Sequence, residues 1–155
     1  MTLSRRLARP LLSSIFISGG LNGLQNAHSK VGAAEKVLGP LSNKLPLPAD
    51  TKTVVQANAA VQVGAGLLLA IGKAPRLASL ALIGSLVPTT LAGHRFWEES
   101  EPRAKSQQQV HFFKNLSLIG GLLLAAVDTG GAPSLGYRAR RRASRASSRA
   151  ASILP

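Results

Sequence analysis

Long apolar runs alternate along the chain with short polar or charged connections. The apolar runs occupy residues 7–24, 53–72, 77–93 and 110–127. Each is about as long as the roughly 17–25 residues that a helix needs to cross a bilayer. Carboxylates are missing from all four runs, and bases are rare within them. The pattern therefore predicts an all-α fold, an integral membrane four-helix bundle.

Chain length and composition divide the sequence into two parts. With 155 residues, we expect one domain at residues 1–136, because there is no room for a soluble module beside a membrane bundle. Residues 137–155 (YRARRRASRASSRAASILP) are basic and low in complexity. Such a composition buries too little apolar surface to fold, so we expect a disordered tail. Its bases would fix the orientation of the protein in the membrane and contact anionic lipid.

Small residues mark the places where the predicted helices could approach one another. Gly19, Gly20 and Gly23 lie on closely related faces of the first run, and Gly120 and Gly121 are adjacent in the fourth. Because lipid is as apolar as the side chains, membrane helices gain little from burying apolar surface against one another. They associate through close packing at small residues such as these. We expect both sites to be helix–helix contacts.

Prolines are expected to shape two further segments. Residues 33–38 could form one short helix that stops at Gly39 and Pro40. Pro88 lies inside the third run, where its missing N–H leaves the Gly84 carbonyl without a helical donor. One of the two threonines that follow, or a neighbouring helix, could fill that vacancy.

The charge distribution argues against a nucleic-acid-binding protein. The formal net charge is +13, yet aromatic residues make up only 4% of the chain and charged residues 16%. A nucleic-acid interface would need Lys and Arg spread over one folded face with aromatics among them, whereas here the bases collect at the termini and in connections. The absence of cysteine excludes disulfides, thiol catalysis and cysteine-ligated clusters within the chain.

The N-terminal run admits three interpretations. A secretory signal peptide would need small residues at positions −3 and −1 of a cleavage site, and Gln25-Asn26-Ala27 supplies only the second. A mitochondrial presequence fits the Arg- and Ser-rich, acid-free start. We favour a retained first span at residues 7–24, with Pro10 in its first turn, where a missing N–H matters least.

Four spans place both termini on one side of the membrane. That side would carry eleven Lys and Arg residues, against seven in the two opposite connections. The positive-inside rule then puts both termini and the basic tail in the cytoplasm of a cell whose plasma membrane holds the protein.

This orientation gathers the polar residues of the spans at the outer end, where we predict a chamber that opens outward. Its proposed wall consists of residues from the third connection and the fourth span, faced by two amides of the second span: His94, Glu98, His111, Lys114 and Asn115, with Asn58 and Gln62 opposite.

Each of these residues also has a plainer interpretation. Lys114 could simply extend its ammonium to the interface, and Asn58 with Gln62 could be interhelical hydrogen-bonding groups worth ~1 kcal/mol or less each. His94, Glu98 and His111 match no specific zinc spacing, so we predict no metal site. The case for haem ligation by His94 and His111 is weaker still, because both lie at one membrane edge and haem usually has buried axial ligands.

Several blocks of the sequence resemble the DoxX family of small four-span bacterial membrane proteins, in particular its actinobacterial branch. The resemblance reaches to about Arg142 and rests on residues 8–22, 58–70, 85–99 (SLVPTTLAGHRFWEE) and 111–135. It implies a four-helix bundle and a link to membrane redox chemistry, because related proteins are similar to a subunit of thiosulfate:quinone oxidoreductase or take part in oxidative-stress defence. It implies no catalytic residue set.

Two functional hypotheses follow. The first is a subunit or accessory of a membrane redox system that contacts quinone in the polar chamber and works with membrane or soluble redox partners. The second is a non-catalytic membrane scaffold or small-solute carrier. No phosphate loop, nucleophile elbow or paired-carboxylate motif occurs, so neither hypothesis assigns an autonomous enzyme activity.

Overall fold

The computed structural model describes residues 3–42, 50–128, 141 and 144, and the ordered elements are all helices. In chain order they are α1 (Leu3–Gln25), the 3-10 turn η1 (Ala27–Lys30), α2 (Val31–Ser42), α3 (Thr51–Ala70), α4 (Pro75–Gly93), the 3-10 turn η2 (Phe96–Glu98) and α5 (Pro102–Val127). This confirms the all-α prediction. The predicted tail lies outside the described residues except for Arg141 and Ser144.

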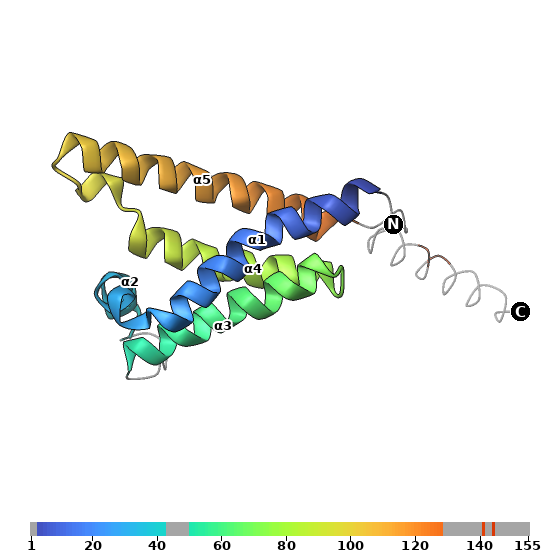
Figure 1. The fold of residues 1–155 in the computed structure, drawn as a ribbon, viewed down its shortest axis with the longest axis horizontal. Helices are drawn as coiled ribbons and strands as arrows, with labels where there is room; N and C mark the ends of the chain where they lie inside the picture. The colour runs from blue at the N-terminus through green and yellow to red at the C-terminus, as the bar shows by residue number, and fades with distance from the viewer. Residues whose placement is uncertain (1–2, 43–49, 129–140, 142–143, 145–155) are drawn as a thin grey trace, which may run out of the picture.

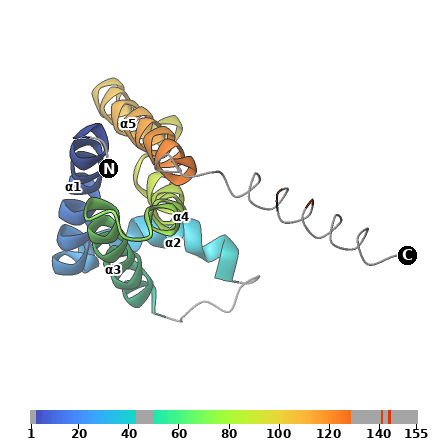
Figure 2. The same ribbon diagram turned by 90° about the vertical axis from the view of Figure 1, so that its right-hand side faces the viewer.

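The four long helices run up and down between two ends of the molecule. The start of α1, the α3–α4 turn and the end of α5 lie at one end, here called the terminal end (Figure 1). The opposite end, here called the α2 end, holds α2 and the α4–α5 connection. Helix α3 packs against α1 and α4, while α5 packs mainly against α4 (Figure 2).

The outer surface of the bundle is apolar. Helices α3, α4 and α5 are each long and apolar enough to cross a membrane, and large hydrophobic side chains point outward on all four long helices, including Leu11, Leu67, Leu80 and Leu124. Exposed apolar surface of this extent meets lipid rather than water. Helix α1 is also long enough to cross a membrane, but it has three arginines in its first half and is not one of these candidate spans. Its role as a fourth span stays a prediction.

Glycines bring α1 and α3 into close contact, as predicted. A Cβ added at Gly20 would lie 2.7 Å from the Ala59 carbonyl oxygen, and one at Gly23 would lie 2.9 Å from the Ala59 Cβ. In return, a Cβ at Gly66 of α3 would meet Ile17 at 2.9 Å. The two backbones therefore touch over several turns, which only residues without a side chain permit.

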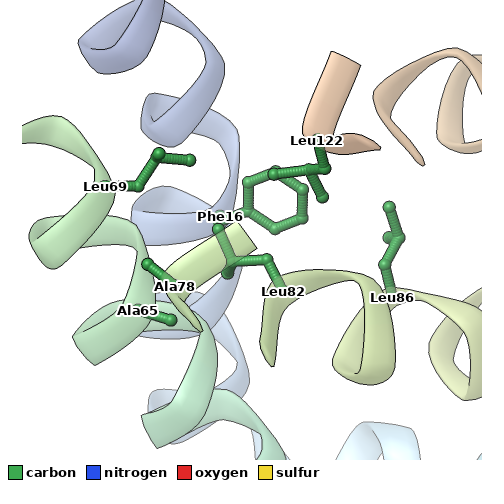
Figure 3. Packing of buried hydrophobic residues seen from close by; sticks show 7 residues of the cluster. All are labelled: Phe16, Ala65, Leu69, Ala78, Leu82, Leu86 and Leu122. Carbon is green, nitrogen blue, oxygen red and sulfur yellow. The ribbon is translucent and has the colours of Figure 1, made fainter. Parts of the chain in front are cut away.

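The predicted contact at Gly120 and Gly121 is found for one of the two. A Cβ at Gly121 would meet Leu12 of α1 at 3.4 Å, whereas one at Gly120 would have no neighbour within 4 Å. The hydrophobic core lies in this half of the bundle, and its side chains Phe16, Leu82 and Leu122 meet at the centre (Figure 3).

Ion pairs join the start of α1 to the residue that follows α5. Asp128, which follows α5, accepts from Arg5 Nε at 2.9 Å and from Arg9 Nη2 at 3.2 Å. Arg9 is only 8% exposed, so its charge needs this carboxylate. The contact fixes the end of α5 against the first turns of α1.

The predicted stop of α2 at Gly39 and Pro40 was wrong, because the helix continues to Ser42. Pro40 cannot donate to the Lys36 carbonyl. That carbonyl instead accepts from Arg95 Nη2 at 3.3 Å, so a side chain replaces the missing helical bond. Helix α5 likewise begins at Pro102, about two turns before the predicted span, since Glu101 caps it by accepting from the amides of Arg103 and Ala104.

The Gly20 contact gives a stability prediction. Gly20→Ala should lower the free energy of unfolding by about 1–3 kcal/mol, because the new methyl group meets the Ala59 backbone, which cannot move aside cheaply. Thermal unfolding of the detergent-solubilised protein measures this. The control is Gly64→Ala on α3, where a Cβ meets nothing within 4 Å; it should unfold at the wild-type temperature or above. Equal midpoints for the two variants would contradict the close contact.

Candidate ligand cavity at the α2 end

A cavity of about 230 Å³ lies between α1, α2, α3 and α4 at the α2 end. Each of the four helices forms one wall of the cavity. Helix α1 contributes Gly19 and Gly23, α2 contributes Val37 and Leu38, and α3 contributes Val54, Asn58 and Gln62. Pro88, Thr89 and Gly93 of α4 form the fourth wall, and Lys30 of η1 completes the lining.

The cavity exists because small residues face one another across these helices. Gly19, Ala34, Ala92 and Gly93 all line it, and side chains of this size leave space between helices that larger ones would fill. Helix α2 packs against α3 and α4 and forms one wall of the cavity. Its residues 33, 34, 37 and 38 line the cavity, a spacing that places them on one helical face.

A hydrogen-bond network borders the cavity on the α3 and α4 sides. Asn58 Nδ2 donates to Thr89 Oγ1 at 3.2 Å, and that hydroxyl donates to the Ser85 carbonyl at 2.7 Å. Gln62 is only 8% exposed. Within the described residues, its carboxamide has no hydrogen-bond partner.

The start of α3 beside the cavity is fixed by a side-chain cap. Asp50 accepts from the Thr53 hydroxyl at 2.7 Å and from the amides of Lys52 and Thr53. These bonds, that of the Thr53 hydroxyl first, lower the pKa of Asp50 below its ordinary value. The capped turn positions Val54 and Val55 in the cavity wall.

The predicted wall residues of α4, α5 and their connection form a second polar cluster. His94 Nδ1 lies 2.7 Å from Gln108 Oε1, and the His94 ring stacks on His111 with 5.2 Å between centroids. Lys114 Nζ lies 3.5 Å from His111 Nδ1. Asn115, which is buried, donates to Thr90 Oγ1 at 3.0 Å.

Glu98 pairs with Arg95 at 2.7 Å and not with Lys114. Lys114 itself is exposed, which favours the plainer interpretation of a lysine that reaches the interface. Across the part of the chain that the structure describes, no group of three His, Asp or Glu residues could hold a metal ion.

The seven predicted site residues therefore do not lie along one chamber. Asn58 and Gln62 line the cavity, and none of the other five residues does. The two adjacent threonines of α4 mark this division, since Thr89 binds Asn58 of α3 and Thr90 binds Asn115 of α5. Neither hydroxyl reaches the Gly84 carbonyl: each donates instead to the carbonyl four residues before it, on Ser85 and Leu86.

Sequence reasoning missed the contribution of η1 and α2. Lys30 and the small apolar face of α2 line the cavity, but the segment was interpreted as a polar connection with one short helix. The detectable signal was the helical spacing of Ala33, Ala34, Val37 and Leu38.

Arg95 fastens α2 over the cavity. Its Nε donates to the Leu91 carbonyl at 2.7 Å, its Nη1 to Glu98 at 2.7 Å and its Nη2 to the Lys36 carbonyl at 3.3 Å. One guanidinium thus joins the end of α4, η2 and the interrupted turn of α2. Its planar fork of donors makes such a three-way contact available.

An all-helical bundle with an apolar exterior and a lined cavity near one end defines a multi-pass membrane protein. The sequence model of the DoxX family matches residues 5–95, more than half of the chain, and the chain belongs to this family. The match ends before η2 and α5, and the actinobacterial branch stays a prediction. No curated protein and no solved structure matches the chain.

The Arg95 contacts predict that α2 loosens when they are removed. Arg95→Met should speed amide hydrogen exchange in α2 on the order of tenfold, because the Lys36 carbonyl loses its donor. Exchange followed by mass spectrometry measures this. Exposed Arg103 offers the matched control Arg103→Met, which should leave α2 unchanged. Unaltered exchange in the Arg95 variant would show that other contacts hold α2.

Proposed function

We propose that this protein is a subunit or accessory of a plasma-membrane redox system and that its cavity receives the headgroup of a quinone. The observation that carries the proposal is the cavity itself, which is mainly apolar and bordered by Asn58 and Gln62. Mostly apolar pockets with a few convergent polar groups are the usual form of small-molecule sites.

The size and chemistry of the cavity support a single ring as its occupant. Its volume of about 230 Å³ is below the ~300–1,000 Å³ of sites for drug-sized ligands. Valine and leucine side chains can cover the faces of a ring, and the amide N–H groups of Asn58 and Gln62 can donate to a carbonyl oxygen. A lipid-soluble quinone meets these requirements and reaches the site through the membrane.

The second polar cluster takes a different place in this proposal from the one that the sequence indicated. None of these five residues lines the cavity, so His94, Glu98, His111, Lys114 and Asn115 are not proposed to touch the ring. Of these, His94, Glu98, His111 and Lys114 present charged or protonatable groups to a docking redox partner protein, while Asn115 is buried against Thr90.

The core supports binding rather than passage. Phe16, Leu69, Leu82 and Leu122 fill the bundle between the cavity and the terminal end, each at most 3% exposed. A carrier would have to open this packed layer, at the cost of its dispersion contacts. The scaffold function remains the alternative outcome of the test below.

Filling the cavity should remove the quinone. Protein purified from native membranes in mild detergent is extracted with organic solvent, and the extract is analysed for quinone. Ala34→Phe puts a ring into the cavity and should reduce the extracted quinone at least tenfold. Gly32→Phe, on the same helix but with open space around the added carbon, should retain it. A quinone-free wild-type protein that co-purifies with soluble enzymes would favour the scaffold instead.

We further propose that the terminal end faces the cytoplasm, since bases dominate there. The chain contains no cysteine, so single cysteines report topology without background. In intact cells, a membrane-impermeant maleimide should label Glu99→Cys in the α4–α5 connection. It should label Lys73→Cys in the α3–α4 turn only after permeabilisation. The reverse pattern would invert the orientation, and labelling of both variants in intact cells would remove α4 as a span.

A further inference from the structure

Gln62 is a largely buried polar residue whose carboxamide opens onto the cavity. It is more than nine-tenths buried and faces the cavity, yet its carboxamide has no hydrogen-bond partner among the described residues. A carboxamide that faces a cavity and bonds to no other described residue keeps its donors and its acceptor available to a bound molecule. Such a group marks a place where a ligand or water completes the site.

Lys30 is the one charged residue among those that line the cavity. It is half-buried, and its Nζ lies 3.8 Å from the position that a Cβ on Gly23 would take. Among the described residues it has no carboxylate partner. A partly desolvated ammonium without a counter-charge favours an anion beside it.

The spacing of these two groups is set by α1. Gln62 Oε1 lies 3.7 Å from the position of a Cβ on Gly19, while Lys30 Nζ stands over Gly23. Gly19 and Gly23 are one turn apart on the same face, which corresponds to ~6 Å along the helix axis. The carboxamide and the ammonium therefore stand over successive turns of one cavity wall, at a separation that a single substituted ring can bridge.

We propose that Lys30 and Gln62 anchor two oxygens of one ring and that the oxygen at Lys30 is ionised. This inference rests on the proposed function and names its ligand class: a mainly apolar ring with one neutral oxygen substituent for the Gln62 carboxamide and one anionic oxygen for the Lys30 ammonium. An acidic hydroxyquinone and an aromatic carboxylate share this chemistry.

The rest of the lining agrees with an anionic ligand. One N–H of Asn58 bonds to Thr89 at 3.2 Å and leaves the other for a neutral oxygen, and no acidic residue lines the cavity. The charge that Lys30 brings is therefore not neutralised within the site. Because the surroundings are apolar and the dielectric is low, a charge-assisted hydrogen bond counts for more there than in water.

Matched pairs of probes test the inference on the full chain in nanodiscs. Binding of hydroxynaphthoquinone is compared with that of its neutral methoxy ether, and binding of para-hydroxybenzoate with that of its methyl ester, by calorimetry at neutral pH. In the wild-type protein, the anion of at least one pair should bind about tenfold more tightly than its neutral partner. The pair that shows this preference identifies the ligand as a hydroxyquinone or a carboxylate.

Variants separate the two anchors. Lys30→Met should abolish the preference for the anion while changing the affinity for the neutral partner less than threefold, and Lys30→Arg should restore the preference. Gln62→Leu should weaken both members of the preferred pair. Lys36→Met, which removes an exposed lysine of α2 outside the cavity lining, should behave as wild type, and thermal unfolding checks that each variant is folded.

The outcomes distinguish this inference from the proposed function. If the neutral methoxynaphthoquinone binds and the anions bind no more tightly, or if Lys30→Met keeps the preference, the anionic-ligand inference fails while quinone binding stands. If no quinone probe binds and native extracts contain no quinone, the proposed function fails. Preference for the carboxylate alone supports the inference and overturns the quinone as ligand.

Discussion

The close approach of α1 and α3 is the contact on which the rest of this structure depends. Inside a bilayer, burying apolar side chains between helices gains little, because lipid is equally apolar. The helices associate instead where Gly20 and Gly23 let the α1 backbone reach Ala59. This contact aligns the second half of α1 with the first half of α3, so that Gln62 and Asn58 come to line a cavity rather than lipid.

Helix α4 divides the polar interior into two parts. Its consecutive threonines each bond back to their own helix and accept from an asparagine on opposite sides, Asn58 of α3 and Asn115 of α5. An arrangement of this kind joins three helices through one turn of α4 with few polar atoms exposed to lipid. The same turn contains Pro88, which also lines the cavity, so the cavity wall and the helix packing share it.

The α2 end combines a small helix with a single arginine. Helix α2 is too short to cross a membrane and instead lays one face over the cavity. Pro40 interrupts its hydrogen bonding, and Arg95 supplies the missing donor from the end of α4. Helix α2 also packs against α3 and α4, so Arg95 adds a specific polar link to a cover that apolar packing already holds in place.

The sequence by itself determined the helical class, the membrane location and the use of the α1 glycines as a helix contact, because spans need long uncharged runs and close packing needs residues without side chains; that α3 is the partner came from the structure. It also singled out Asn58 and Gln62, since amides inside an apolar run are rare. Only the tertiary structure decided that His94, Glu98, His111, Lys114 and Asn115 lie apart from them, that α2 continues through Pro40, and that Lys30 joins the cavity. Each of these outcomes depends on which side of α4 a neighbour packs or on a donor distant in sequence. Periodicity along one chain carries no information about either.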